Sequence, residues 1–467
     1  MGTYTKAQLE TELTRIKNAV ASCRTAIYNK GVTSIPANVT LAQLATYANL
    51  IECSHPDILL KWLGNGTSYS ATRADVYFDT GLYPDTNTSF DAVFSRPVKG
   101  GDAMLFGTDD STSYSFFFIP YYGSGYSWWF SNAYVSSGNW RPTGTPTNVG
   151  NFVHLGFVRN PYATSNYGYL SVGTDSWTKA LSSTKTTARY TITLFARNKG
   201  TSVDCKAYNG TRIKYIKFIN SNTGKLLRFY IPVLHWNNGA YVPCFYDKVN
   251  DSYIYNLGTG TVSYESYGYK VCDSIYYNTR VTNTSYGFLT DAPYGVGDAN
   301  FVKASAETLS GEQFLLGWRK PTGGNYKFGL CIATSSAYMY YPKSNGCGGS
   351  NSNKAFTSGT RMDVAGLRTG SANYRRLYAG GTTVTSSTEE ATNTSVSGQK
   401  YFILGNNGSI YPNTKVYYAA VNNNVYTTAY NYIPILDGTT PKFIELERGT
   451  LISYNGSASA VSYDLLD

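Results

Sequence analysis

The chain lacks the side chains and patterns that most enzyme sites require. It contains only three histidines, and none of them stands in a His-Glu-x-x-His metal motif. The Gly-x-Ser-x-Gly pattern of a serine nucleophile is missing too. Two glycine pairs, Gly323-Gly324 and Gly348-Gly349, lack the Lys-Ser or Lys-Thr that follows in a phosphate-binding loop. We therefore expect no catalytic residues, no metal site and no cofactor.

Long apolar runs are absent as well, and charges are sparse. The amphipathic N-terminus does not look like a secretory signal, and no run is long enough to span a membrane. Charged residues make up only 15% of the chain, and the net charge of +10 is scattered, which argues against a nucleic-acid partner. Seven cysteines form an odd set without paired close spacing, which indicates neither a disulfide framework nor a zinc site. We expect synthesis in a reducing cytoplasm, with no membrane partner.

Tyrosine, glycine and small polar residues are abundant instead. The 467 residues include 44 tyrosines and 45 glycines, a composition typical of short strands and many turns. After His55-Pro56, short apolar runs such as Ser115-Phe116-Phe117-Phe118-Ile119 recur between Gly, Asn, Asp or Pro residues. This spacing predicts a mainly β protein built from sandwiches or barrels.

One strand cluster occurs twice. Tyr230-Ile231-Pro232-Val233-Leu234 returns as Tyr432-Ile433-Pro434-Ile435-Leu436. At nearly unchanged separations, Val262-Ser263-Tyr264 follows the first and Val461-Ser462-Tyr463 follows the second. The recurrence predicts two copies of one domain, after a segment of a different kind. The predicted boundaries are 1–54 for the leading segment, 55–266 for the first copy and 267–467 for the second copy.

The leading segment carries helix signals. Thr5 with Gln8, and later Thr40 with Gln43, fit capping boxes, so a helix should begin at Lys6 and a second short helix should follow Thr40. Apolar positions recur at alternating steps of four and three: Leu9, Leu13, Ile16, Val20, Cys23 and Ile27. This row is typical of a coiled-coil seam or of a helix packed within its own chain. We interpret the segment as an adaptor that oligomerises or docks onto a larger assembly.

Aromatic residues gather in a Gly/Ser-rich stretch of the first copy. The candidates for glycan binding are Tyr121, Tyr122, Tyr126, Trp128, Trp129 and Trp140. Consecutive residues on a strand point to opposite faces, so some of these rings should face solvent, where they could stack on sugars. The alternative is a second core layer or a buried subunit interface.

Paired carboxylates would be needed for glycan hydrolysis. The nearest candidate is Glu445-Leu446-Glu447, with two carboxylates at strand spacing. A solvent-facing pair on an edge strand is the favoured interpretation of these residues. The sequence therefore does not support catalysis.

A family resemblance rests on several of these stretches. Arg212-Ile213-Lys214-Tyr215-Ile216-Lys217-Phe218, the strand cluster at 230–233 and Phe245-Tyr246-Asp247-Lys248-Val249 resemble the concanavalin-like (laminin-G-like) jelly rolls of bacteriophage virion proteins. Lys30-Gly31-Val32 with Ile35-Pro36 is similar to the leading segment of phage tail and fibre proteins. The second copy departs at 443–448, where the tyrosine-aspartate turn is lost.

The resemblance implies two tandem antiparallel β-sandwich (jelly-roll) domains after a short N-terminal α-helical segment. It implies a head or tail fibre on the virion surface, made in the host cytoplasm and attached to other virion proteins through its N-terminal helices. Fibres of this kind imply a homotrimer, and the outward domains would contact host-surface polysaccharide. The alternatives are a decoration protein that contacts only neighbouring subunits and, less favoured, a glycan hydrolase.

Overall fold

The computed structural model describes most of the chain. The described residues are 5–28, 35–40, 42–44, 55–67, 70, 72–95, 101–109, 115–121, 128–132, 139–140, 150–159, 167–180, 187–221, 223–279, 287–293, 297–306, 312–319, 327–333, 336–343, 346–353, 357–368, 375–386, 400–405, 412–423, 428–456 and 460–466. The chain forms two compact units, Met1–Pro56 with Asp467 and Asp57–Leu466. Within the described residues, no helix is long and apolar enough to cross a membrane.

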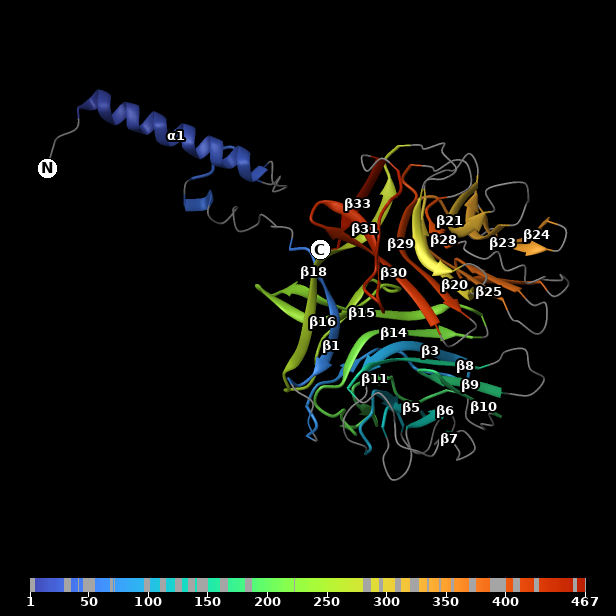
Figure 1. Cartoon of the computed structure of the whole chain (residues 1–467). Coiled ribbons are helices and arrows are strands. Elements are labelled where there is room, and N and C mark those ends of the chain that lie inside the picture. The colour runs from blue at the N-terminus through green and yellow to red at the C-terminus, as the bar shows by residue number, and fades with distance from the viewer. Residues whose placement is uncertain are drawn as a thin grey trace. The chain divides into compact units, whose positions relative to one another are not determined.

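The N-terminal unit contains helix α1, Lys6–Tyr28 (Figure 1). Its start is the predicted one, because Gln8 Oε1 accepts the Thr5 N–H at 2.8 Å while Thr5 Oγ1 accepts the Gln8 N–H at 3.3 Å. The second capping box forms in the same way, with 2.9 Å from Thr40 N to Gln43 Oε1. Both capping boxes are therefore confirmed.

The unit has a small core of its own. Ile35, Val39 and Leu44 are buried together, and Val20 of α1 packs against them. Arg24 holds the returning chain, since its Nε donates to the carbonyl of Pro36 at 2.9 Å. These contacts bury one side of α1 near its C-terminal end.

The larger unit is made almost wholly of antiparallel β-strands, so the mainly β prediction with a short N-terminal helix is confirmed. The described strands form three sheets, of 19, 8 and 6 strands. The large sheet contains β1 (Ile58–Asn65), β3 (Thr88–Ser95), β8 (Phe152–Arg159), β9 (Tyr167–Val172), β10 (Asp175–Ala180), β14 (Arg212–Asn220), β15 (Leu226–Asn237), β16 (Ala240–Asp247), β17 (Ser252–Ile254), β18 (Val262–Tyr277), β20 (Gly297–Ser305), β25 (Met362–Arg368), β26 (Arg375–Ala379), β27 (Thr382–Ser386), β29 (Lys415–Asn423), β30 (Thr428–Asp437), β31 (Thr440–Glu445), β32 (Leu451–Ile452) and β33 (Val461–Leu465).

Two smaller sheets complete the unit. The eight-stranded sheet contains β2 (Phe78–Asp79), β4 (Phe106–Thr108), β5 (Phe116–Ile119), β6 (Trp129–Asn132), β7 (Asn139–Trp140), β11 (Thr193–Leu194), β12 (Arg197–Asn198) and β13 (Val203–Asp204). The six-stranded sheet contains β19 (Phe288–Pro293), β21 (Glu312–Arg319), β22 (Lys327–Ala333), β23 (Ser336–Lys343), β24 (Gly346–Asn353) and β28 (Lys400–Ile403).

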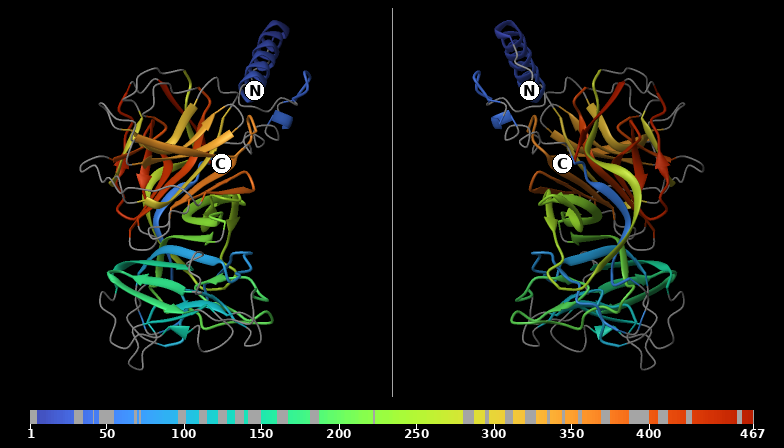
Figure 2. Two further views of the ribbon diagram at one scale, coloured as in Figure 1. Left: turned by 90° about the vertical axis from the view of Figure 1, so that its right-hand side faces the viewer. Right: turned by 90° about the vertical axis from the view of Figure 1, so that its left-hand side faces the viewer.

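Figure 2 shows the strands of this unit from two further sides. Three apolar cores hold the sheets together. The first core combines side chains of β3, β8 and β14 with those of β4, β5 and β11. The second combines β20, β25 and β29 with β19, β21 and β28. The third lies between β14–β16 and β29–β31, which all belong to the large sheet. Strand β14 is therefore covered on both faces, which explains its nearly continuous burial.

The two copies of the sequence pattern take the same strand pairing. Tyr230 on β15 lies opposite Asp247 on β16, and Tyr432 on β30 lies opposite Glu445 on β31. Pro232 and Pro434 likewise lie opposite Phe245 and Phe443. The recurrence in sequence is thus a recurrence in register, and we call 57–269 and 270–466 the first and second repeats.

Strand β18 belongs to both repeats. Its first part, up to Lys270, pairs with β1, and its last part, from Cys272, pairs with β33. Lys270 itself lies opposite Ile58 on β1 and Leu436 on β30. The boundary predicted at 266/267 falls inside this strand, so the repeats are joined without a linker.

Candidate functional site

Trp128 is not available to a surface ligand. Its side chain is 1% exposed and belongs to the first core. Its ring lies edge-on to Trp177, with 4.7 Å between the centroids and 73° between the planes. The prediction of a glycan-binding role is therefore wrong for Trp128, because packing between the two sheets takes both faces of the indole out of solvent.

The neighbouring candidates lie differently. Trp129 is half-buried on the opposite face of β6, where its ring lies edge-on to Phe117 at 4.9 Å in a small cluster with Met104 and Ile119. Tyr121 is half-buried. Tyr122, Tyr126 and the side chain of Trp140 lie outside the described residues. The alternation of facing directions that the strand pattern predicts is confirmed for 128 and 129.

Two histidines have carboxylate partners. His154 Nε2 lies 2.6 Å from Asp91 Oδ1, and His235 Nδ1 lies 2.8 Å from Asp57 Oδ1. The His235 ring stacks on Tyr253, with 3.8 Å between the centroids. Neither histidine is within hydrogen-bond distance of a serine, threonine or cysteine in the contacts of the described chain, so they form no nucleophile pair.

Glu445 is fully buried, so its interpretation as half of a solvent-facing pair is wrong. Its carboxylate accepts the backbone N–H groups of Asn431, Glu447 and Arg448, at 3.3, 3.2 and 2.7 Å. Burial raises the pKa of this carboxyl to about 7, while Arg448 and the N–H groups favour the ionised form. Glu445 is thus a turn-holding group rather than an acid open to a substrate.

The turn expected to be lost in the second repeat is kept in another form. Asp247 of the first repeat accepts the backbone N–H groups of Phe229 and Val249, at 2.9 and 3.0 Å. Glu445 occupies the position of Asp247 in the matching register and accepts equivalent N–H groups. A carboxylate therefore holds the turn in both repeats, although the side chain of Glu445 is one methylene longer than that of Asp247.

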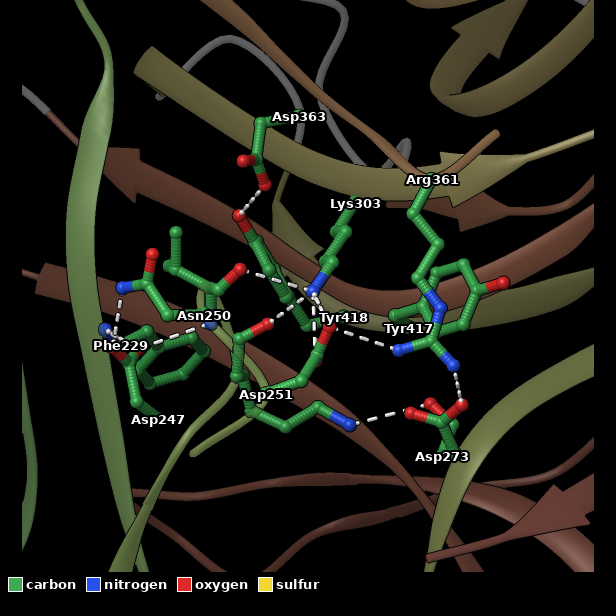
Figure 3. Close-up of polar contacts among 12 residues, drawn as sticks. Phe229, Asp247, Asn250, Asp251, Asp273, Lys303, Arg361, Asp363, Tyr417 and Tyr418 are labelled. Carbon is green, nitrogen blue, oxygen red and sulfur yellow. Dashed lines mark hydrogen bonds and ion pairs between the residues drawn. The ribbon is translucent and has the colours of Figure 1, made fainter. Parts of the chain in front are cut away.

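The turn at 247–251 carries a cluster of ion pairs and hydrogen bonds, shown in Figure 3. We call it the joint, because it connects the first repeat to β20, β25 and β29 of the second. Lys303 Nζ lies 2.8 and 2.9 Å from the two carboxylate oxygens of Asp251, and it also donates to the carbonyls of Lys248 and Val249 at 3.0 and 3.1 Å. Arg361 lies 3.0 Å from Asp251 and also pairs with Asp273.

The second repeat also places a turn against the first repeat. The turn at 445–449 of the second repeat lies against the first repeat, where Lys214 Nζ donates to the carbonyl of Glu447. A Cβ at Gly449, which has φ +73°, would lie 3.1 Å from the hydroxyl of Tyr267. The turn of each repeat thus contacts a lysine of the other repeat, Lys303 on β20 in one case and Lys214 on β14 in the other, a reciprocal exchange typical of two-fold interfaces.

Lys248 is the most strongly perturbed cation of the joint. Its side chain is almost fully buried, and its Nζ donates to the carbonyl of Asp273 at 3.2 Å. Burial lowers the pKa of Lys248 to about 8, with Lys303 and Arg361 adding repulsion and Asp273 opposing the shift.

Lys248→Met should therefore stabilise the protein at neutral pH. Between about pH 8 and 10.5 the unfolded chain holds the Lys248 proton and the folded chain does not, so wild-type stability rises with pH by roughly 3 kcal/mol. The stability of the variant should not show this rise, and its advantage over the wild-type protein should be largest below pH 8. Urea unfolding at pH 7 and pH 10 measures both effects. Lys270→Met, at an exposed position, should keep the wild-type slope.

The chemistry of the joint is structural. Its carboxylates contact lysine, arginine and backbone N–H groups, and the described residues contain no group of three His, Cys, Asp or Glu side chains that could hold a metal ion. Sequence reasoning missed Lys303 and Arg361 entirely, because Asp251, the carboxylate that both of them contact, lies in the other repeat. The signal available in the sequence was Lys303 itself, a lysine that directly follows the apolar residues Phe301 and Val302.

Comparisons with known proteins give only distant likenesses. No family model matches the chain, and no curated protein does. Among solved structures, domains LG4-5 of the mouse laminin alpha1 chain share 9% identity at a TM-score of 0.27, covering 88% of this chain and 96% of that chain. The LG1-3 region of the laminin alpha2 chain shares 11% at a TM-score of 0.22, covering 89% and 66%. Trypanosoma rangeli sialidase shares 11% at 0.24, covering 68% and 64%. At these TM-scores the fold assignment rests on the strand pairing itself.

Proposed function

We propose that the protein is a non-enzymatic bacteriophage virion protein, a head or tail fibre that attaches through its N-terminal segment. One observation carries the attachment part: the apolar row on α1 is exposed. Leu9, Leu13 and Ile16 are 56%, 53% and 46% exposed although they share one helix face. An isolated helix gains little from exposing such a row, so a partner surface is needed.

The row is shorter than the seam predicted from sequence. Val20 packs within the N-terminal unit, which uses that position inside the chain. Cys23 is exposed, and the side chain of Ile27 lies outside the described residues. We propose that the row from Leu9 to Ile16 joins copies of the chain, as a homotrimer, before other virion proteins are contacted.

The β unit supports a display role in this proposal. Its repeats, which we propose are two tandem jelly rolls, are fastened by the joint and by a shared strand, so they form one solid body. Their outward surfaces would contact host polysaccharide, with Trp129 the described tryptophan of the candidate set that stays partly exposed. A decoration protein that contacts only subunits is the second candidate, favoured by the burial of Trp128. Glycan hydrolysis is disfavoured by the burial of Glu445.

Charge placed on the row should abolish self-association. We expect Leu9→Glu with Leu13→Glu and Ile16→Glu to convert the oligomer into folded monomers, because three carboxylates would meet their counterparts across a seam. Thr11→Glu with Asn18→Glu, on the opposite side of α1, should leave the oligomer intact. Light scattering after size exclusion gives the mass of each.

Attachment is tested on the particle. A chain without residues 1–54 should fold and fail to join virions, whereas the Thr11→Glu, Asn18→Glu protein should still join. Incorporation of the truncated chain at the wild-type level would exclude the adaptor role.

A further inference from the structure

A second polar cluster, separate from the joint, lies in the third core. Lys217 on β14 is completely buried, and its Nζ lies 2.6 Å from Asp91 Oδ2. The same nitrogen lies 2.6 Å from the side-chain oxygen of Asn431 on β30 and 3.1 Å from that of Asn422 on β29. A lysine of the first repeat therefore lies between a carboxylate of its own repeat and a carboxamide of the second.

The surroundings of Lys217 are aromatic. The centroids of the Tyr215, Phe229 and Phe301 rings lie 5.8, 5.8 and 5.9 Å from its Nζ. Burial lowers the pKa of Lys217, although Asp91 opposes the shift, so the neutral amine is more accessible than in water. A desolvated lysine amine is a nucleophile towards carbonyl carbon. The site thus holds a nucleophile in contact with an amide.

Asn431 carries an unexplained group. The residue is fully buried, and among the described residues its side-chain Nδ2 has no hydrogen-bond partner. A buried amide nitrogen without a partner is costly, and such groups in a folded protein usually have a chemical reason. The side-chain oxygen of Asn431 accepts a hydrogen bond from Lys217, whereas Nδ2 is held by no hydrogen bond in the described part of the chain. Nδ2 is therefore the atom that can depart as a leaving group.

Asp91 is in direct contact with the amine of Lys217. Burial alone would raise its pKa, but Lys217 and His154 outweigh burial and hold the pKa of Asp91 at about 2. The carboxylate is therefore ionised and in contact with the lysine, as a general base must be. His154 Nε2 lies at its other oxygen, at 2.6 Å, and keeps the carboxylate oriented.

We propose that Lys217 and Asn431 join in a spontaneous isopeptide bond, catalysed by Asp91, that covalently ties the two repeats. Asp91 takes a proton from the Lys217 ammonium, and the neutral amine attacks Cγ of Asn431. The new C–N bond forms as a tetrahedral intermediate. In that intermediate the attacking nitrogen and Nδ2 are bonded to the same carbon, so Asp91, in contact with the first, can pass protons to the second. The old C–N bond then breaks, and ammonium leaves. Lysine ammonium and carboxamide thereby become a secondary amide and an ammonium ion, with no oxidant, reductant or cofactor.

The fold holds the lysine amine and the asparagine carboxamide next to each other before the reaction begins. The reacting groups are held by two strands that face each other across a packed core, so the encounter is already made in the folded chain. Release of ammonia also removes the unpartnered Nδ2. The bond would close a loop from 217 to 431, which restricts the unfolded chain. This inference does not rest on the attachment role.

The mass of the denatured full-length protein tests the proposal directly. We expect a mass lower than the sequence mass by one ammonia, and a branched proteolytic peptide that joins Lys217 to Asn431. Asparagine can also lose ammonia by closing a succinimide ring, so Lys217→Arg must restore the full sequence mass. Full mass in the wild-type protein, with 217 and 431 in separate peptides, would overturn the proposal.

Four further variants separate the roles of these residues. Asn431→Asp should lose water instead of ammonia and arrive at the same final mass as the linked wild type. Asn422→Ala should keep the link, whereas Asp91→Asn should slow or abolish it in a protein that still folds by circular dichroism. A link that survives Asn431→Ala and disappears with Asn422→Ala would contradict the assignment of Asn431.

Discussion

Trp128→Ala is expected to lower the free energy of unfolding by about 3–5 kcal/mol, the usual cost of deleting a buried aromatic ring. The indole is 1% exposed and contacts Trp177 and Phe118 between two sheets, so its loss leaves a cavity that the sheets cannot easily close. Urea unfolding followed by tryptophan fluorescence and circular dichroism measures the change.

Trp129→Ala is the matched control, one residue along the chain on the outer face. It should cost less, since the ring is only half-buried. The pair also decides how a glycan array is interpreted. Binding lost with Trp129→Ala in a folded protein would indicate contact with sugar, while binding lost with Trp128→Ala would report only misfolding. Wild-type stability of Trp128→Ala would contradict its place in the core.

Asp251→Asn should cost about 3 kcal/mol, because it leaves Lys303 buried without its carboxylate. Asp251 has φ 52°, in the left-handed region that asparagine tolerates, so the substitution removes the charge without straining the turn. The Lys303 side chain is 4% exposed, which prevents water from replacing the lost partner. Denaturant titration at neutral pH gives the difference.

A double variant tests whether the loss belongs to the pair. Asp251→Asn combined with Lys303→Met should lose less stability than the sum of the two single variants, since the double variant removes both charges of the pair. The exposed pair of Lys61 and Glu265, 40% and 52% exposed, provides the comparison: Glu265→Gln should change stability by less than about 1 kcal/mol. Equal effects of Asp251→Asn and Glu265→Gln would show that the joint is not a stabilising contact.

Local signals in the sequence were sufficient for the helix and for the strand content. The capping boxes at Thr5 and Thr40 depend on side chains three residues apart, so they can be recognised without knowledge of distant contacts. The recurrence of the strand cluster could be recognised because both stretches repeat most of the same residues at nearly the same separations, and the structure gives Tyr230 and Tyr432 matching positions in the register. Such features can be predicted because the interacting residues are close in the chain.

The contacts between repeats could not be predicted in this way. Strict alternation would place Ile213 and Tyr215 on one face of β14, yet an irregularity between them puts Ile213 in the first core and Tyr215 in the third. That shift aims Lys217 at the second repeat. Glu445 was misplaced for a related reason, since its partners are backbone N–H groups that only the folded turn brings together.

The shared strand β18 has a consequence for binding. A strand of 16 residues extends for roughly 50 Å and leaves no flexible connection between the repeats. If each repeat carries a contact surface, as proposed above, the distance between the two surfaces is fixed. The effective concentration of the second surface is then not lowered by a flexible linker. A receptor with matching spacing would be held by both surfaces at once, and one with a different spacing by only one. The affinity of the protein for a surface would then depend on the spacing of the receptors on that surface.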